Sequence, residues 1–222
     1  MNPRIVVVPI IVGIAAGAVW FAQGTKGTPA ATWRVGTGDD MRHARNYDEL
    51  APESAVQLAF TCDEPRHVYV FSHSAEDGTV LLHPSPNVHT DATNPLAAGR
   101  VVLPGRNRDR DLAWNTRMQI LATTTFLVVA AKEPLTDLEA LFPRMRRWTN
   151  TARTDGSMHV TLPPTGEKDL IGAPRQELPH ALLQRAADRC TVATIVNGPL
   201  EPDTVHPGVW TGGVKVKETG KR

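Results

Sequence analysis

The sequence lacks the features that would assign a reaction to it. It contains no G-x-S-x-G element, no H-E-x-x-H pair, no P-loop and no dinucleotide-binding glycine pattern. A formal net charge of +1 over 222 residues provides no basic surface of the kind that nucleic acids require. Two cysteines are too few to hold a metal by themselves. We therefore expect no nucleic-acid partner and predict no cofactor, and the sequence leans away from an enzyme.

The composition is that of a folded chain rich in strands and loops. Hydrophobic residues make up 41% and charged residues 21%, which is close to the average of globular proteins. Eighteen prolines and seventeen glycines favour a β-dominated fold over a helical bundle. The length suits one domain with accessory segments.

The N-terminus contains the longest apolar run, eighteen residues without a charge from Ile5 to Ala22. This length is at the lower limit for a helix that spans a bilayer, and Trp20 lies where an interfacial aromatic residue is expected. Arg4 on the short flank favours an N-in orientation. We expect residues 1–22 to be an uncleaved anchor in the inner (cytoplasmic) membrane, with the rest of the chain outside the cytoplasm.

A cleaved signal peptide is the alternative, because the small residues Ala16, Gly17 and Ala18 resemble a cleavage site. Residues 23–50, which begin with a small and polar stretch, are predicted to be a flexible linker. Residues 51–218 are predicted to form one extracytoplasmic, β-rich domain.

Short alternating or apolar segments predict an antiparallel β-sandwich-like domain. The predicted strands are 55–60, 68–73, 79–83, 100–103, 118–122, 125–131 and 209–217. Two helices are expected to pack on it: one that begins at a capping box formed by Thr136 and Glu139 and ends near Pro143, and one at 177–189.

Three landmarks occur in a characteristic order: the strand Val68–Phe71 with its Asp77-Gly78 turn, Asn94-Pro95-Leu96 before the strand 101–104, and Phe126–Ala130 leading into Glu133-Pro134-Leu135. This order resembles the bacterial "domain of unknown function 4384" family over roughly residues 55–142. The resemblance implies an extracytoplasmic β-rich accessory or binding module. It carries over no catalytic residue, because none is assigned in that family.

Histidines provide weak candidates for a metal site. A two-residue turn at Asp77-Gly78 would place His73 and His83 on opposite faces of the hairpin, whereas a three-residue loop 76–78 with a bulge would place both on one face. We favour the second geometry. Even then a third ligand is needed, and His89 is a nearby supply. Strand-end histidines at the solvent boundary are the simpler interpretation.

The segment G-R-N-R-D-R-D contains the candidate binding residues Arg106, Arg108 and Arg110, with Trp114 close behind. This segment is either a solvated loop or a recognition loop for a carboxylate, a phosphate or a protein. Trp114 is either a core residue or an interface anchor.

Cys62 and Cys190 both lie at the ends of predicted elements. An oxidising compartment would permit a disulfide between them, and the alternative is two separate buried thiols. Taken together, the sequence predicts a non-enzymatic, membrane-anchored binding or scaffolding module of the cell envelope with a protein partner. The alternatives are an envelope hydrolase with a dispersed Ser/His/Asp-type site, or a metal- or ligand-sensing domain.

Overall fold

Buried and more exposed side chains alternate along β-strands of the structure, as β1 (Ala30–Thr37) shows. In β1, Ala31, Trp33 and Val35 are buried while the residues between them are more exposed. This is the period-two pattern of a strand with one face in the core. The computed structural model describes residues 27–37, 40–51, 54–74, 78–86, 88–115, 123–147, 149–152, 158–161, 178–192 and 197–218.

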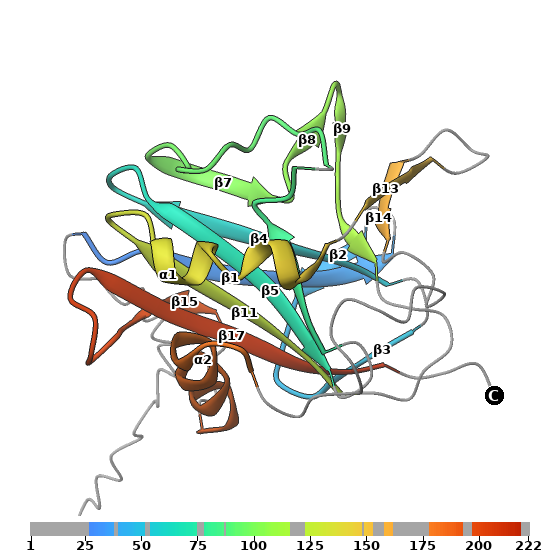
Figure 1. The fold of residues 1–222 in the computed structure, drawn as a ribbon. Coiled ribbons are helices and arrows are strands. Elements are labelled where there is room, and N and C mark those ends of the chain that lie inside the picture. Colours follow the sequence, from blue (N-terminus) through green and yellow to red (C-terminus); the bar gives the residue numbers. More distant parts are fainter. Residues whose placement is uncertain are drawn as a thin grey trace, which may run out of the picture.

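Two main sheets pack against each other among these residues (Figure 1). The first sheet contains β13 (Thr149–Ala152), β14 (Met158–Thr161), β10 (Trp114–Asn115), β4 (Ala55–Cys62), β1, β15 (Gly198–Pro199), β2 (Asp40–His43) and β7 (Gly99–Leu103). The second contains β12 (Arg146–Arg147), β6 (Gly78–His83), β5 (His67–Ser74), β11 (Thr123–Ala131), β17 (Val209–Glu218), β16 (Glu201–Pro202) and β3 (Asp48–Leu50). A separate small hairpin pairs β8 (Arg106–Asn107) with β9 (Arg110–Asp111).

The main core lies between the two sheets. Trp33 of β1 contacts Phe126 of β11 with ring centroids 5.6 Å apart, so the first sheet packs directly on the second. Both residues belong to one cluster of buried apolar side chains contributed by both sheets. Most pairings are antiparallel, and β10–β14, β12–β6 and β17–β3 are parallel. The predicted mainly β, sandwich-like fold is confirmed.

Two α-helices cover the outer face of the second sheet (Figure 1). They are α1 (Thr136–Glu139), followed by the 3-10 turn η1 (Phe142–Arg144), and α2 (Ala181–Val192). The hydroxyl of Tyr69 on β5 donates to Glu139 Oε1 at 2.5 Å, which fixes α1 to the sheet. His180, directly before α2, contacts Asp137 Oδ2 at 3.1 Å and connects the two helices.

Two predictions about local structure are wrong. Residues 30–50 are not a linker, because β1 pairs with β4 over seven residue pairs in the middle of the first sheet, and β2 and β3 follow it. The domain therefore begins near residue 30 instead of 51. Thr136 does not cap α1 with its side chain either: the residue before the helix is Leu135, and Glu139 is engaged by Tyr69.

The strands predicted around 55–60, 68–73, 79–83, 100–103, 125–131 and 209–217 are all present. The strand predicted at 118–122 and the apolar segment 5–22 lie outside the described residues. Among the residues that are described, we find no helix with the length and apolarity needed to cross a membrane.

Candidate functional site

The β8–β9 hairpin projects from the two packed sheets (Figure 1). It leaves the first sheet after Leu103, which pairs with Leu58 of β4, and returns at Trp114, which pairs with Val56 of the same strand. Both ends of the projecting segment are thus held by one central strand. Loops carried by a rigid scaffold in this way are common positions for binding residues.

Hydrogen bonds from the preceding loop hold the base of the hairpin. Asp91 Oδ1 accepts from the backbone N–H of Arg106 at 2.7 Å, and the N–H of Asp91 donates to the carbonyl of Arg106 at 3.0 Å. The amide of Asn107 donates to the carbonyl of His89 at 3.0 Å. Gly105, with φ of 103°, lies so close to Asp91 that a Cβ there would approach its carboxylate to 2.7 Å. The base is therefore fixed by backbone contacts as well as by β4.

The tip of the hairpin consists of Arg108 and Asp109, which are both exposed. Arg108 has a φ of 55°, a left-handed conformation that is uncommon for residues other than glycine. Two-residue hairpin turns require such positive φ values, and Asn or Gly normally supplies them. An arginine at this position holds its side chain out on a strained turn.

The three candidate arginines differ in their surroundings. Arg106 forms an exposed ion pair with Asp111 across the hairpin, with 2.8 Å between Nε and Oδ1. Such surface pairs contribute little to stability. Arg108 is exposed at the tip, and Arg110 lies in β9 opposite Asn107. The hairpin thus carries charges of both signs, which suits a protein surface better than a small anion.

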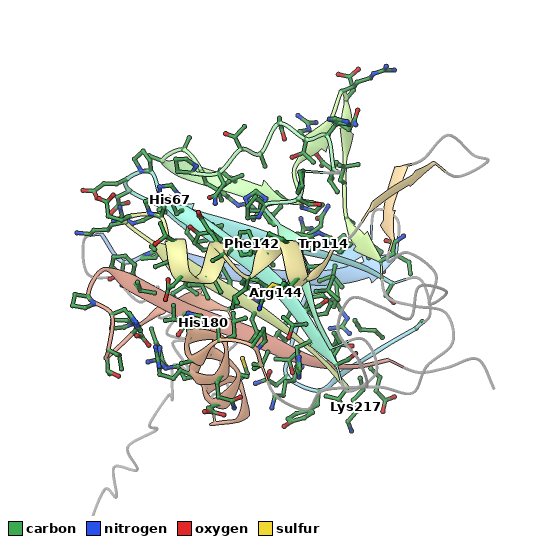
Figure 2. All side chains as sticks on the ribbon, in the orientation of Figure 1. His67, Trp114, Phe142, Arg144, His180 and Lys217 are labelled. Carbon is green, nitrogen blue, oxygen red and sulfur yellow. The ribbon has the colours of Figure 1, made fainter. Side chains whose placement is uncertain are left out.

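Trp114 is a core residue. Its side chain is completely buried in the cluster between the sheets, and it pairs with Val56 on β4 (Figure 2). Of the two alternatives considered for Trp114, the structure shows the core residue, so its ring is not exposed as the side chain of an interface anchor would be. What remains of the predicted binding residues is the charged hairpin itself.

The histidines do not converge. His73 pairs with Thr79 and His83 with Val70, because Ser74 pairs with Gly78 and a further irregularity lies at Val70/Phe71. This register differs from that of the two-residue turn at Asp77-Gly78 and from that of the three-residue loop 76–78, so both predicted registers are wrong. Residues 75–77 between the paired ends lie outside the described part of the chain.

The environments of the three histidines differ. His73 is half-buried and contacts Thr79 Oγ1 at 3.0 Å, as expected for a histidine at a strand end. His83 is buried, which lowers its pKa to about 4, and His89 is exposed. Within the residues described, no three His, Cys, Asp or Glu side chains are grouped so that they could hold a metal ion.

The predicted disulfide is not formed. Cys62 and Cys190 are both free and buried. Cys62 belongs to the core between the sheets, whereas Cys190 lies on α2 in the cluster on the outer face of the second sheet. Gly213 on β17 permits the close approach of α2, because a Cβ at this position would meet Cys190 Sγ at 2.7 Å. The second sheet separates the two thiols.

Sequence reasoning missed a polar cluster between α2 and the loop before β17. The carboxylate of Asp203 is completely buried and accepts from Arg185 Nε at 2.7 Å and from His206 Nδ1 at 2.8 Å. Burial alone raises the pKa of Asp203, but the hydrogen bonds from Arg185 and His206 outweigh it and hold the pKa well below its usual range. In the sequence, the only indication of this cluster is that His206 follows Asp203 by three residues. Nothing in the sequence indicates that Arg185, 18 positions earlier, contacts Asp203.

An Asp–His pair such as Asp203 and His206 is also one part of a hydrolase triad. In a triad the histidine also contacts a nucleophile. The described contacts of the His206 ring are with Asp203 and with Arg185, whose Nη2 lies 3.0 Å from Nδ1. This cluster fits the attachment of α2 better than catalysis.

Comparison with known protein families, curated proteins and solved structures found no match for this chain. The resemblance over residues 55–142 therefore stays a prediction.

Proposed function

We propose that the chain is a non-enzymatic, membrane-tethered binding module of the bacterial cell envelope, and that it holds a protein partner through the β8–β9 hairpin. The apolar segment 5–22 supplies the anchor, a single pass in the inner membrane with the domain outside the cytoplasm. The resemblance over residues 55–142 implies the same class of module.

The observation that carries this proposal is the position of Arg108: it lies at the exposed tip of a hairpin whose base is fixed, and its backbone is left-handed. The base of the hairpin is fixed by Asp91 and β4, so the tip keeps its position relative to the sandwich. Arg108 itself occupies a left-handed conformation that glycine would adopt without strain. Strained residues on rigid supports are concentrated at functional sites, and arginine is enriched among the residues that dominate protein interfaces. Both facts support a recognition role for the tip.

The tether is tested by fractionation of the full chain expressed in bacteria. A single-pass anchor keeps the protein in the membrane fraction through high-salt and alkaline washes, with its full mass intact. A soluble product that begins near Val19 would show that the segment is a cleaved signal peptide and would contradict the anchor.

The hairpin is tested by cross-linking in intact cells followed by purification of the tagged full chain. We expect Arg108→Glu to reduce recovery of the cross-linked partner about tenfold, the effect of losing about 1.4 kcal/mol of binding free energy. Arg45→Glu is the matched control, because Arg45 is an exposed arginine in the turn between β2 and β3 and undergoes the same charge change. Equal recovery with the Arg108 variant and the wild type would contradict the assignment.

A further inference from the structure

The chain enters the folded domain at one defined end of the sandwich. The backbone N–H of Gly27 donates to Asp63 Oδ2 at 3.2 Å, and the carbonyl of Pro29 accepts from the N–H of Leu200 at 2.8 Å. β1 begins immediately afterwards, with Ala30 paired to Thr61 near the end of β4. From Gly27 onward the chain is therefore attached to the body of the domain.

Several loops gather at this end, which we call the tether end. β5 begins, β11 ends and β17 begins here, because His67 pairs with Ala131 and Ala131 pairs with Val209. The loops that form the surface are 63–66, 132–135 and 203–208. At the opposite end, the far end, Thr123 at the start of β11 pairs with Lys217. Figure 2 labels His67 and Lys217 at these two ends of the sheet.

The distance from the membrane to the tether end is limited by chain length. Five residue steps separate Ala22, the last residue of the apolar run, from Gly27. A fully extended chain covers at most about 3.6 Å for each residue, so these steps span at most about 18 Å. Along the sheet, the far end is separated from the tether end by the length of β11, whose nine residues extend over about 30 Å. A flexible linker over residues 23–50 would have allowed a distance of about 100 Å, so the start of the fold near residue 30 makes the limit much tighter.

Charge does not attract the tether end to a bilayer. Three acidic side chains, Asp63, Glu64 and Glu133, are exposed there, and the exposed cations Lys132 and Arg100 do not outnumber them. Anionic headgroups attract basic segments and repel carboxylates. The distance between the domain and the membrane is therefore determined by the short tether. Electrostatic attraction to the headgroups does not contribute to it.

We infer that the tether end faces the lipid surface at a distance of about 18 Å or less, and that the far half of the domain faces away from it. This inference rests on the membrane anchor of the proposed function. The β8–β9 hairpin belongs to the far half, since it leaves and rejoins the sheet opposite Leu58 and Val56, toward the start of β4. The hairpin is thus turned toward partners in the envelope, while loops 63–66, 132–135 and 203–208 form the surface that lies against the membrane.

The test uses the full chain in vesicles of phosphatidylethanolamine and phosphatidylglycerol that contain a trace of headgroup-labelled acceptor lipid. A donor dye is attached to Glu133→Cys, in the exposed loop 132–135 at the tether end, or to Lys217→Cys at the far end, and energy transfer to the acceptor is measured. Both native thiols are buried, and the parent chain controls for their labelling. We expect transfer from position 133 to exceed that from position 217 at least about twofold, because the two sites differ by the length of β11.

A tether-extension variant provides the second measurement. Twenty Gly/Ser residues inserted between Lys26 and Gly27 lengthen the connection to a flexible coil of about 25 Å root-mean-square extent. We expect this insertion to abolish most of the difference between the two positions. Equal transfer from both positions in the unmodified tether, or no effect of the insertion, would overturn the inference while the anchor stands. Release of the chain from vesicles by alkaline washing would overturn the anchor itself, and the inference with it.

Discussion

Arg185 Nε lies 2.7 Å from Asp203 Oδ1, and this ion pair connects α2 to the loop that precedes β17. The carboxylate is completely buried, and the arginine side chain is 26% exposed. Asp203 also accepts from the backbone N–H groups of Val205 and His206. One carboxylate thereby orders the loop and holds the helix in place.

Removing this carboxylate is expected to destabilise the fold strongly. Breaking a buried pair by deleting one partner costs about 3–5 kcal/mol, since the remaining charge loses its compensation. We expect about 3 kcal/mol for Asp203→Ala, because Arg185 retains some contact with water. Urea unfolding of the variant measures the loss.

Glu201→Gln is the matched control for the Asp203 variant. Glu201 pairs with Arg189 of the same helix at 3.4 Å, but its side chain is 62% exposed. Exposed pairs contribute about 0–1 kcal/mol, so the control should remain close to the wild type. Equal losses in the two variants would show that burial does not determine the contribution of Asp203.

The pH dependence of stability at acid pH should report on Asp203. Its pKa in the folded protein is lowered, with the hydrogen bonds from Arg185 and His206 outweighing the effect of burial. The stabilisation is therefore complete above the unfolded pKa of about 3.9 and is lost as the pH falls below it. We expect the difference in unfolding free energy between wild type and Asp203→Asn to shrink as the pH falls below about 4. A constant difference down to pH 2 would contradict this.

His83 should determine stability at a higher pH. Burial lowers its pKa to about 4, and its Nε2 has no hydrogen-bond partner. The unfolded chain takes up a proton below about pH 6.5 and the folded protein does not, so stability is full above this value and falls as the pH approaches 4. Two and a half pKa units correspond to a loss of up to about 3 kcal/mol. His83→Leu should flatten this slope, whereas His43→Gln, on an exposed site of β2, should leave it unchanged.

The contrast between His83 and His73 shows why the site could not be predicted from the sequence. Both histidines end apolar runs, and a solvent-boundary position was the natural expectation for each. Register decides their burial: the irregularity between Val70 and Phe71 places His83 opposite Val70. One residue of slip exchanges the faces of a strand, and no local pattern specifies such a slip.

Strands could be predicted wherever the local sequence is apolar or alternates between apolar and polar residues. β4, β5, β6 and β11 have largely apolar segments of strand length, and in β17 valines alternate with lysines over residues 214–217; each of these strands was expected. β1 was missed because polar and small residues precede it, although Trp33 and Val35 alternate as a half-buried strand should. In addition to its pairing with β4, β1 is held by a remote contact: the N–H of Trp33 donates to Asn197 Oδ1, 164 positions away.

The hydroxyl of Tyr69 should contribute to stability through α1. It donates to Glu139 and accepts from the backbone N–H of Leu135 at 3.0 Å, so it closes the connection between β5 and the start of the helix. Burial raises the pKa of Tyr69, and the hydrogen bond to Glu139 raises it further, which keeps the phenol protonated at neutral pH. We expect Tyr69→Phe to lose about 1–2 kcal/mol in urea unfolding. Glu139→Gln retains an acceptor and should lose less.

The two thiols should be unreactive in the folded protein and fully available after unfolding. Cys62 and Cys190 are free, and burial raises both pKa values, that of Cys190 to about 11. Reactivity requires the thiolate, so an alkylating reagent at pH 8 should modify neither residue at an appreciable rate under native conditions. In denaturant without reductant, mass spectrometry should find two modified cysteines for each chain.

The side chains of Cys62 and Cys190 lie on opposite faces of the second sheet, so oxidation should not join them without unfolding. Recovery of an intramolecular disulfide from the native protein would contradict the arrangement of layers described above.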